Sequence, residues 1–437
     1  MTSPEPVVIT ALGVVSALGR GVQEFAAGLR RGDCGIRHFL SPFPRTGAFL
    51  PDFSAVDFLR TLPECPGEVQ RIAQRVLRQA PESAQMTVAA ATEAWLMAGL
   101  HLMPIREERI GIIIGGNNIS QRYLAAGWRR FEDTPDYLSP RHAFLSLDTA
   151  LVGLVSEVLG IHGCGLTVGA ASASGNVAVW NAKQLLRAGV ADCIIVCCVS
   201  SELSSLEMHA FQLLGAAAPV SLESCPAALY RPFDATSQGF IPGEAAACIV
   251  LETASSARLR GARVWATVAG ASLFLDGSHL PHASTSGEIH AMHSALLESQ
   301  LHPTEVDYVN AHGSGSIQGD RCECDALVEV FGEKQPWVNS TKSLTGHCLA
   351  AAGLVELVAC TLQMSEGFLH PNRNLRQPID HRIRFVGDQS VATPLKNVLS
   401  NSFGFGGFNS SIVLRQPGME FGNVFVAGEK IQSASWN

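Results

Sequence analysis

The chain has 437 residues, 47% of them hydrophobic and 16% charged, and its formal net charge is -8. This length exceeds one average domain, and so few charged residues indicate a compact globular protein with much buried backbone. The negative charge argues against a general affinity for nucleic acid or for an anionic membrane. It favours small-molecule or protein partners.

The first predicted element is a strand that begins at Val7, close to the start of the chain. No basic segment, apolar stretch and cleavage site precede it, so we expect no export signal. The longest apolar runs, such as 110–114 and 193–199, are far shorter than the roughly 18 residues that a membrane span needs. Twelve scattered cysteines, several inside apolar runs, favour a reduced cytoplasmic compartment without disulfides.

Helical and strand patterns alternate along most of the chain. The alanine-rich stretches 87–100 and 177–187 are predicted helices, and each precedes an apolar predicted strand, 110–114 or 193–199, with glycine near the joints. This alternation predicts an α/β protein in which helices cover both faces of a central sheet.

The second half of the chain repeats the pattern of the first. The strand that begins at Ile110 has a counterpart at Val306, roughly 200 residues later, each after a helical stretch. We therefore predict two halves, residues 1–257 and 258–437, that pack tightly with a site between them. Residues 415–437 follow the last predicted strand without clear periodicity, and the sequence leaves their role open.

A turn of small residues at Ser172 is the first segment with a chemical signature. Residues 167–175 lead from a strand into a helix, and such a turn presents one side chain and its own N–H at a helix N-terminus. Ser172 is the residue presented there. The alternative is an ordinary tight turn with a capping serine, which this segment alone leaves open.

Two glycine-framed segments carry histidines. Residues 310–320 form a strand that ends near His312 and continues as a hydroxyl-rich loop, and residues 339–348 place Lys342 five residues before His347. A single histidine is usually structural. Two histidines and a lysine, all after predicted strands, indicate a polar site in a cleft.

The segment 401–409 is too rich in glycine for a strand interior and too aromatic for a loop in solvent. It suits a close approach of backbone to a ligand. The glycines do not indicate a nucleotide site, because no GxGxxG follows the first strand and no GK[ST] occurs. We also predict no metal site, because the local cysteine and histidine pairs lack a second pair at zinc-binding spacing.

Together these segments resemble the β-ketoacyl synthase family in order and approximate spacing. The matching motifs are the turn at Ser172, AHGSGS, STKSLTGH and NSFGFGG, supported by RPFDATSQGFIPGE and the opening VVITALGVVSALG. The resemblance covers nearly all of residues 6–414. It implies the thiolase-like α/β fold, with five layers αβαβα built from two pseudo-repeats, and usually a homodimer.

The resemblance implies catalytic roles for four residues, Ser172, His312, His347 and Lys342, and a supporting role for Glu356. Family members normally carry a cysteine acyl acceptor where this chain has Ser172, and the histidines that match His312 and His347 assist decarboxylation of a malonyl extender. Lys342 with Glu356 is expected to order the surroundings of His347. A serine hydroxyl stays protonated without a strong general base, so we expect Ser172 to be a poor acyl acceptor.

The resemblance also implies how a substrate is held. The backbone N–H groups of Ser172 and Phe405 would form an oxyanion pocket, and Phe405 corresponds to the family's gating phenylalanine. Ser314 and Ser316 stand where family members have threonines that hold the phosphopantetheine arm of an acyl carrier protein. We therefore expect a carrier-borne substrate and no intrinsic cofactor.

Retained histidines without the cysteine indicate decarboxylation without condensation. We expect conversion of malonyl-acyl carrier protein to acetyl-acyl carrier protein for polyketide biosynthesis. The resemblance points to the free-standing decarboxylases of β-branching cassettes, which serve a hydroxymethylglutaryl-synthase-like enzyme. Two alternatives stay open: a non-catalytic partner subunit of the chain-length-factor type, and acyl transfer or condensation through Ser172.

Overall fold

The computed structural model describes residues 5–40, 45–102, 105–219 and 222–418. The tail residues 419–437, whose role the sequence leaves open, lie outside these ranges. Within the described ranges, ten strands form one continuous row. In order across the row they are β12 (Trp337–Asn339), β11 (Tyr308–Asn310), β15 (Asn397–Gly404), β16 (Phe408–Arg415), β9 (Ala266–Ala271), β1 (Val7–Ser16), β8 (Ala245–Thr253), β7 (Cys193–Val199), β5 (Ile110–Gly115) and β6 (Gly165–Val168).

The two ends of this row have the same topology. From the edge inward, the first half has the order β6, β5, β7, β8, β1 and the second half has the order β12, β11, β15, β16, β9. In each half these are the third, second, fourth, fifth and first of the five strands along the chain. In each half the outer neighbours run parallel and the inner ones antiparallel. A short antiparallel contact between β1 and β9 joins the two groups. The predicted pseudo-repeat is confirmed, whereas its boundary at residues 257 and 258 stays a prediction.

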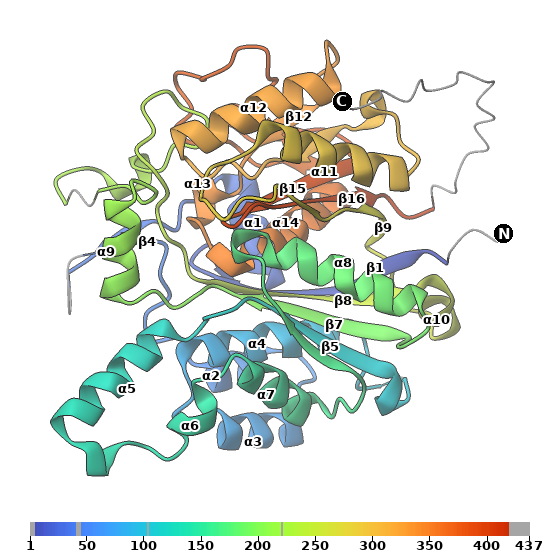
Figure 1. The fold of residues 1–437 in the computed structure, drawn as a ribbon. Helices are drawn as coiled ribbons and strands as arrows, with labels where there is room; N and C mark the ends of the chain where they lie inside the picture. Colours follow the sequence, from blue (N-terminus) through green and yellow to red (C-terminus); the bar gives the residue numbers. More distant parts are fainter. Residues whose placement is uncertain (1–4, 41–44, 103–104, 220–221, 419–437) are drawn as a thin grey trace.

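Helices form three layers around the two strand groups (Figure 1). One layer lies between the groups and the other two cover their outer faces, which confirms the predicted five layers αβαβα. The middle layer consists of α8 (Ser174–Arg187) and α14 (Ala352–Glu366). The outer layers contain α4 (Glu82–Met97) and α7 (Thr149–Leu159) on the first group, and α11 (Thr285–Glu298) and α12 (Ile317–Phe331) on the second.

Shorter elements occupy the connections. Single turns of 3₁₀ helix, Ala171–Ala173 and Leu349–Ala351, lie directly before α8 and α14. The remaining helices of four or more residues are α1 (Val22–Arg31), α2 (Ala55–Thr61), α3 (Gly67–Val76), α5 (Gln121–Asp133), α6 (His142–Leu145), α9 (Ser205–Leu213), α10 (Ala254–Leu259) and α13 (Lys342–Thr345). The short strands are β2 (Gly19–Arg20), β3 (Arg37–Phe39), β4 (Arg45–Gly47), β10 (Phe274–Leu275), β13 (Phe368–Leu369) and β14 (Val391–Ala392).

The middle layer positions the site. α14 is apolar on nearly every side because it lies between two sheets, and it is buried from Ala352 to Met364. α8 and α14 approach closely at their N-termini, where a Cβ at Gly175 would lie 2.3 Å from the Leu354 nitrogen. The 3₁₀ turns that precede the two helices are therefore brought together, and one of them contains Ser172.

The segment 401–409, which is too rich in glycine for a strand interior, spans a hairpin. It forms the end of β15, a tight turn and the start of β16. Glycine is needed only in the turn, where Gly406 and Gly407 have positive φ, while Gly404 lies at the end of the strand beside another backbone.

One helical stretch, Leu349–Glu366, is long and apolar enough by composition to cross a membrane. However, 83% of it is buried inside the protein, between the two strand groups. It is a core helix.

Candidate active site

The turn at Ser172 connects β6 to α8 and is fixed by its neighbours. Ser174 Oγ accepts a hydrogen bond from the Ala170 N–H at 2.9 Å and donates one to the Ala171 carbonyl at 2.7 Å. Ala171 has a φ of 47°, a conformation that residues other than glycine rarely adopt. The side chain of Ser172 lines a cavity whose walls come from both halves of the chain.

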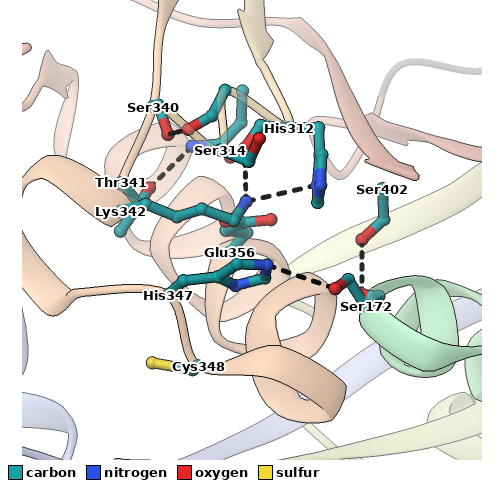
Figure 2. Close-up of polar contacts among 12 residues, drawn as sticks. Ser172, His312, Ser314, Ser340, Thr341, Lys342, His347, Cys348, Glu356 and Ser402 are labelled. Carbon is teal, nitrogen blue, oxygen red and sulfur yellow. Dashed lines mark hydrogen bonds and ion pairs between the residues drawn. The ribbon is translucent and has the colours of Figure 1, made fainter. Parts of the chain in front are cut away.

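The end of β15 packs directly against this turn. Ser402 Oγ donates a hydrogen bond to the Ser172 carbonyl oxygen at 3.1 Å (Figure 2). A Cβ at Gly404 would lie 2.5 Å from the Ala170 oxygen and 3.3 Å from the Ser172 nitrogen, so the close approach requires glycine. Among the described residues, the backbone N–H groups of Ser172 and Phe405 have no acceptor, which leaves both free to donate.

His347 lies between α13 and α14. Its Nδ1 accepts the Leu349 N–H at 3.2 Å, so a neutral ring carries its proton on Nε2. Nε2 lies 3.1 Å from Ser172 Oγ, and the Nε2–H therefore donates to the serine hydroxyl (Figure 2). His347 is thus a donor toward Ser172 and not a base that could remove its proton.

His312 follows β11 and is held at its backbone. The N–H groups of His312 and Gly313 donate to the carboxylate of Glu323 at 2.8 and 2.7 Å. Lys342 Nζ donates to the His312 carbonyl oxygen at 2.5 Å and lies 3.4 Å from Nδ1 (Figure 2). Because an ammonium group only donates, Nδ1 accepts and the proton of a neutral ring is on Nε2. His312 supplies a second N–H donor.

Lys342 also forms a buried ion pair with Glu356. Nζ and Oε1 are 2.5 Å apart, and the two side chains are only 1% and 2% exposed. Burial raises the pKa of Glu356 to about 7, and the charge of Lys342 opposes this rise. Because Lys342 and Glu356 are both out of water, each depends on the other for compensation of its charge.

That this pair orders the surroundings of His347 stays a prediction, and its direct hydrogen bonds lie elsewhere. The hydrogen bonds of Lys342 Nζ go to Glu356 and to His312 instead. The reason is the parallel pairing of β11 and β12, because His312 and Lys342 follow these strands and therefore lie side by side.

Both imidazoles are neutral at physiological pH. Burial lowers the pKa of His312 and of His347 well below the usual range, and the positive charge of Lys342 lowers both further. The two ring centroids are 5.6 Å apart. Two neutral Nε2–H donors therefore occupy one polar corner beside Ser172.

A cavity of about 660 Å³ connects these groups. Phe405 is 43% exposed, which places it near the opening. Ser316 Oγ also caps α12 by accepting the Gly319 N–H at 3.5 Å. All predicted site residues except Lys342 and Glu356 line the cavity, namely Ser172, His312, Ser314, Ser316, His347 and Phe405.

Sequence reasoning missed two residues that hold the site, Glu323 and Ser402. Glu323 fixes the backbone at His312, and Asn401 Nδ2 donates to its carboxylate at 3.2 Å. The signal in the sequence for Glu323 is an acidic residue on the buried face of a helix. Among the described residues no cluster of histidine, cysteine or acidic groups has a metal-binding arrangement.

Family models cover most of the chain. The N-terminal domain of beta-ketoacyl synthase matches residues 4–257, and the C-terminal domain matches residues 265–376. The chain belongs to the β-ketoacyl synthase family. The order of the family's two domains follows the order of the two strand groups along the chain.

Individual relatives of this β-ketoacyl synthase extend over almost its whole length. The polyketide biosynthesis malonyl-ACP decarboxylase PksF of Bacillus subtilis (strain 168) is 36% identical over 94% of this chain and 96% of its own length. Nodulation protein E of Rhizobium leguminosarum bv. trifolii is 31% identical over 94% of this chain and 99% of its own.

Solved structures of other ketosynthases superpose closely. The ishigamide ketosynthase/chain length factor matches with a TM-score of 0.85 and 28% identity, over 95% of this chain and 100% of that one. A type II PKS ketosynthase in complex with its acyl-carrier protein (AntDE:AntF) matches with a TM-score of 0.79 and 27% identity, over the same shares. The fold is therefore the thiolase-like ketosynthase fold that the sequence predicts.

Proposed function

We propose that this β-ketoacyl synthase decarboxylates malonyl-acyl carrier protein to acetyl-acyl carrier protein and does not condense acyl chains. The observation that carries the proposal is the pair of neutral Nε2–H donors, on His312 and His347, beside a serine that no base activates. The name of the Bacillus subtilis relative, a polyketide biosynthesis malonyl-ACP decarboxylase, supports it.

The two imidazoles act on the thioester oxygen of the malonyl group. When the bond between the α-carbon and the carboxylate breaks, CO2 leaves and the electron pair forms an enolate with its charge on that oxygen. An aimed hydrogen-bond donor lowers such a barrier by about 3 kcal/mol. The enolate carbon then takes one proton and becomes the methyl group of the acetyl thioester.

Acyl transfer through Ser172 is disfavoured by the tautomer of His347. A serine nucleophile needs a base that accepts its proton. His347 Nε2 already carries a proton, because Nδ1 accepts the Leu349 N–H. The hydroxyl of Ser172 therefore keeps its proton and is a poor nucleophile. A cysteine thiolate at this position would need no such base.

A non-catalytic partner role is also less favoured. The contacts among His312, Lys342 and Glu356 place two charges in a nearly dry interior, which is costly unless the pair is kept for a purpose. A subunit that only supported another ketosynthase would have no need for this network or for the cavity in front of it.

We further propose an acyl carrier protein as the partner. The hydroxyls of Ser314 and Ser316 line the cavity and suit the amide groups of a phosphopantetheine arm. The solved structure of a ketosynthase with its acyl-carrier protein supports this. We extend the proposal to acetyl supply for β-branching and to the cytoplasm, where the twelve unpaired cysteines would stay reduced.

A homodimer is part of the proposal. β6 is an edge strand whose first two residues, Gly165 and Leu166, are exposed, and an unpaired edge favours pairing with another chain. α5 has no buried residue and exposes Trp128 and Phe131. A second copy along β6 would cover the edge and support the turn at Ser172.

The experiment is an assay of malonyl-acyl carrier protein with the purified enzyme, followed by mass spectrometry of the carrier. We expect the carrier to lose CO2 with the wild type and to keep it with His312→Ala. An unchanged malonyl carrier in the presence of folded wild-type enzyme would rule out the decarboxylase. Activity that requires a cysteine-bearing partner would instead favour the subunit alternative.

A further inference from the structure

Glu288 is a buried carboxyl group beside the active site that none of the steps above uses. It lies in the first turn of α11 and is 1% exposed. Among the described residues, its Oε2 has no hydrogen-bond partner. It lines a side cavity of about 90 Å³, which has room for a few water molecules.

The side cavity adjoins the substrate cavity. Both are lined by His312, Ser314 and Phe405, so the space in front of Glu288 reaches the polar corner where the thioester would lie. His282, which is exposed to solvent, also lines both cavities, so the shared space lies close to solvent. Glu288 therefore lines a space that is continuous with the substrate cavity and close to solvent.

The other carboxyl groups at this cavity have donors. Glu323 and Asp320 each accept two backbone N–H hydrogen bonds, and Asp276 accepts one from Asn409 Nδ2 at 2.9 Å. Within the described chain, Glu288 has neither a cation nor an N–H donor. Its burial, and then the nearby Glu323 among other groups, raise the pKa of Glu288 well above its usual range. Burial therefore favours the protonated form of this carboxyl group.

The decarboxylation needs a proton at this place. The enolate carbon must gain one hydrogen, yet His312 and His347 use their N–H groups to hold the oxygen, and a neutral imidazole is a very weak acid. Lys342 is held by Glu356 and by the His312 carbonyl. Asp320 and Glu323 are engaged by backbone N–H groups, which leaves Glu288 as the buried carboxyl group at this cavity that is free to give a proton.

We propose that Glu288 supplies, through water in the side cavity, the proton that turns the enolate carbon into the methyl group of the acetyl thioester. The O–H bond of Glu288 breaks, a proton passes along the water, and a C–H bond forms at the carbon that lost CO2. Solvent water that enters beside His282 then returns a proton to the carboxylate. This inference rests on the proposed decarboxylase function.

The test measures the fate of the enolate. Malonyl-acyl carrier protein is incubated with the enzyme in buffer that contains ¹³C-labelled CO2 and bicarbonate. Mass spectrometry then follows acetyl formation and the label that enters the remaining malonyl group. When protonation is slow, the enolate lives longer and recaptures CO2, so label in malonyl rises relative to acetyl formed. The variants are Glu288→Gln, Glu288→Asp and, as a control with the same acid-to-amide change in the same cavity, Asp276→Asn.

We expect Glu288→Gln to slow acetyl formation on the order of 100-fold and to raise the ratio of label to acetyl. Glu288→Asp keeps an acid and should lie between the two, and Asp276→Asn should keep the wild-type ratio. A wild-type rate in Glu288→Gln, or a slower rate with an unchanged ratio, would overturn the inference. Failure of the wild type to form acetyl would overturn the proposed function itself, which the same samples reveal.

Discussion

At the scale of single residues, His312 and His347 reach the same tautomer by different routes. Leu349 supplies an N–H to one ring and Lys342 supplies an ammonium group to the other. We expect His312→Ala and His347→Ala each to lower acetyl formation about 100-fold or more, because each removes a donor to the enolate oxygen. Cys348→Ala, beside His347 but outside the cavity, is the matched control for initial-rate measurements. Equal rates in all three variants would contradict this role.

The protonation state of these rings can be observed directly. Their pKa values lie well below the usual range, so the neutral form persists as the pH falls through about 6.5, where an exposed histidine gains its proton. In ¹⁵N NMR spectra of histidine-labelled protein, we expect both rings to remain Nε2–H tautomers between about pH 8 and about pH 6. Assignment comes from His→Gln variants. An Nδ1–H signal, or a midpoint near 6.5, would be incompatible with the geometry.

Lys342 and Glu356 depend on each other. Lys342→Met leaves the Glu356 carboxylate buried without its cation, so we expect a loss of about 3 to 5 kcal/mol in the free energy of unfolding. The double variant Lys342→Met/Glu356→Gln should recover most of this stability but little activity, because His312 still lacks its support. Urea denaturation and the decarboxylation assay separate the two effects. Full activity in the stable double variant would show that Lys342 serves stability alone.

At the scale of elements, the site depends on the contact between the end of β15 and the turn before α8. A Cβ at Gly404 would lie 2.5 Å from the Ala170 oxygen, so we expect Gly404→Ala to displace Ser172 and to reduce activity more than stability. Gly153 in α7 has open space around its Cβ position, and Gly153→Ala should be neutral or stabilise by up to about 1 kcal/mol. Rates and thermal midpoints of both variants check this. Unimpaired activity of Gly404→Ala would mean that the turn tolerates movement.

Sequence patterns predicted the elements that obey local rules. The apolar run 193–199 is β7 with the same bounds, because a fully buried strand is apolar on both faces. α4 begins at Glu82, five residues before the start predicted at residue 87. Pro81 directly precedes the helix and signals its start, whereas alanine-rich composition alone does not locate the first turn. The hairpin at 401–409 was missed because its glycines serve a turn and a tertiary contact, which no local pattern distinguishes.

At the scale of the whole molecule, the site is assembled from segments far apart in the chain. Ser172, His312, Lys342, His347 and Phe405 could be selected from their motifs. The motifs could not show which histidine Lys342 contacts, because this depends on which strands lie next to each other in the sheet. The role of Glu323 could not be predicted for the same reason, because it is set by the loop that packs on α12.

β6 lies at one edge of the strand row and is partly exposed. We expect light scattering to give the mass of a dimer, and Leu166→Glu to shift the protein toward the monomer because it places a charge on the pairing edge. Leu259→Glu, at a residue that is 87% exposed on α10, is the control. Because β6 leads into the turn at Ser172, the monomeric variant should also lose activity. A monomeric wild type would refute the dimer.

In the proposed reaction the carrier loses CO2 while the enzyme never holds an acyl group. The most direct measurement records the intact masses of enzyme and carrier in the same sample during turnover, for the wild type and for Ser172→Cys. We expect acetyl carrier and unmodified wild-type enzyme, whereas Ser172→Cys regains the ability to become acylated. An acyl adduct on wild-type Ser172 that forms and decays with turnover would contradict decarboxylation without acyl transfer.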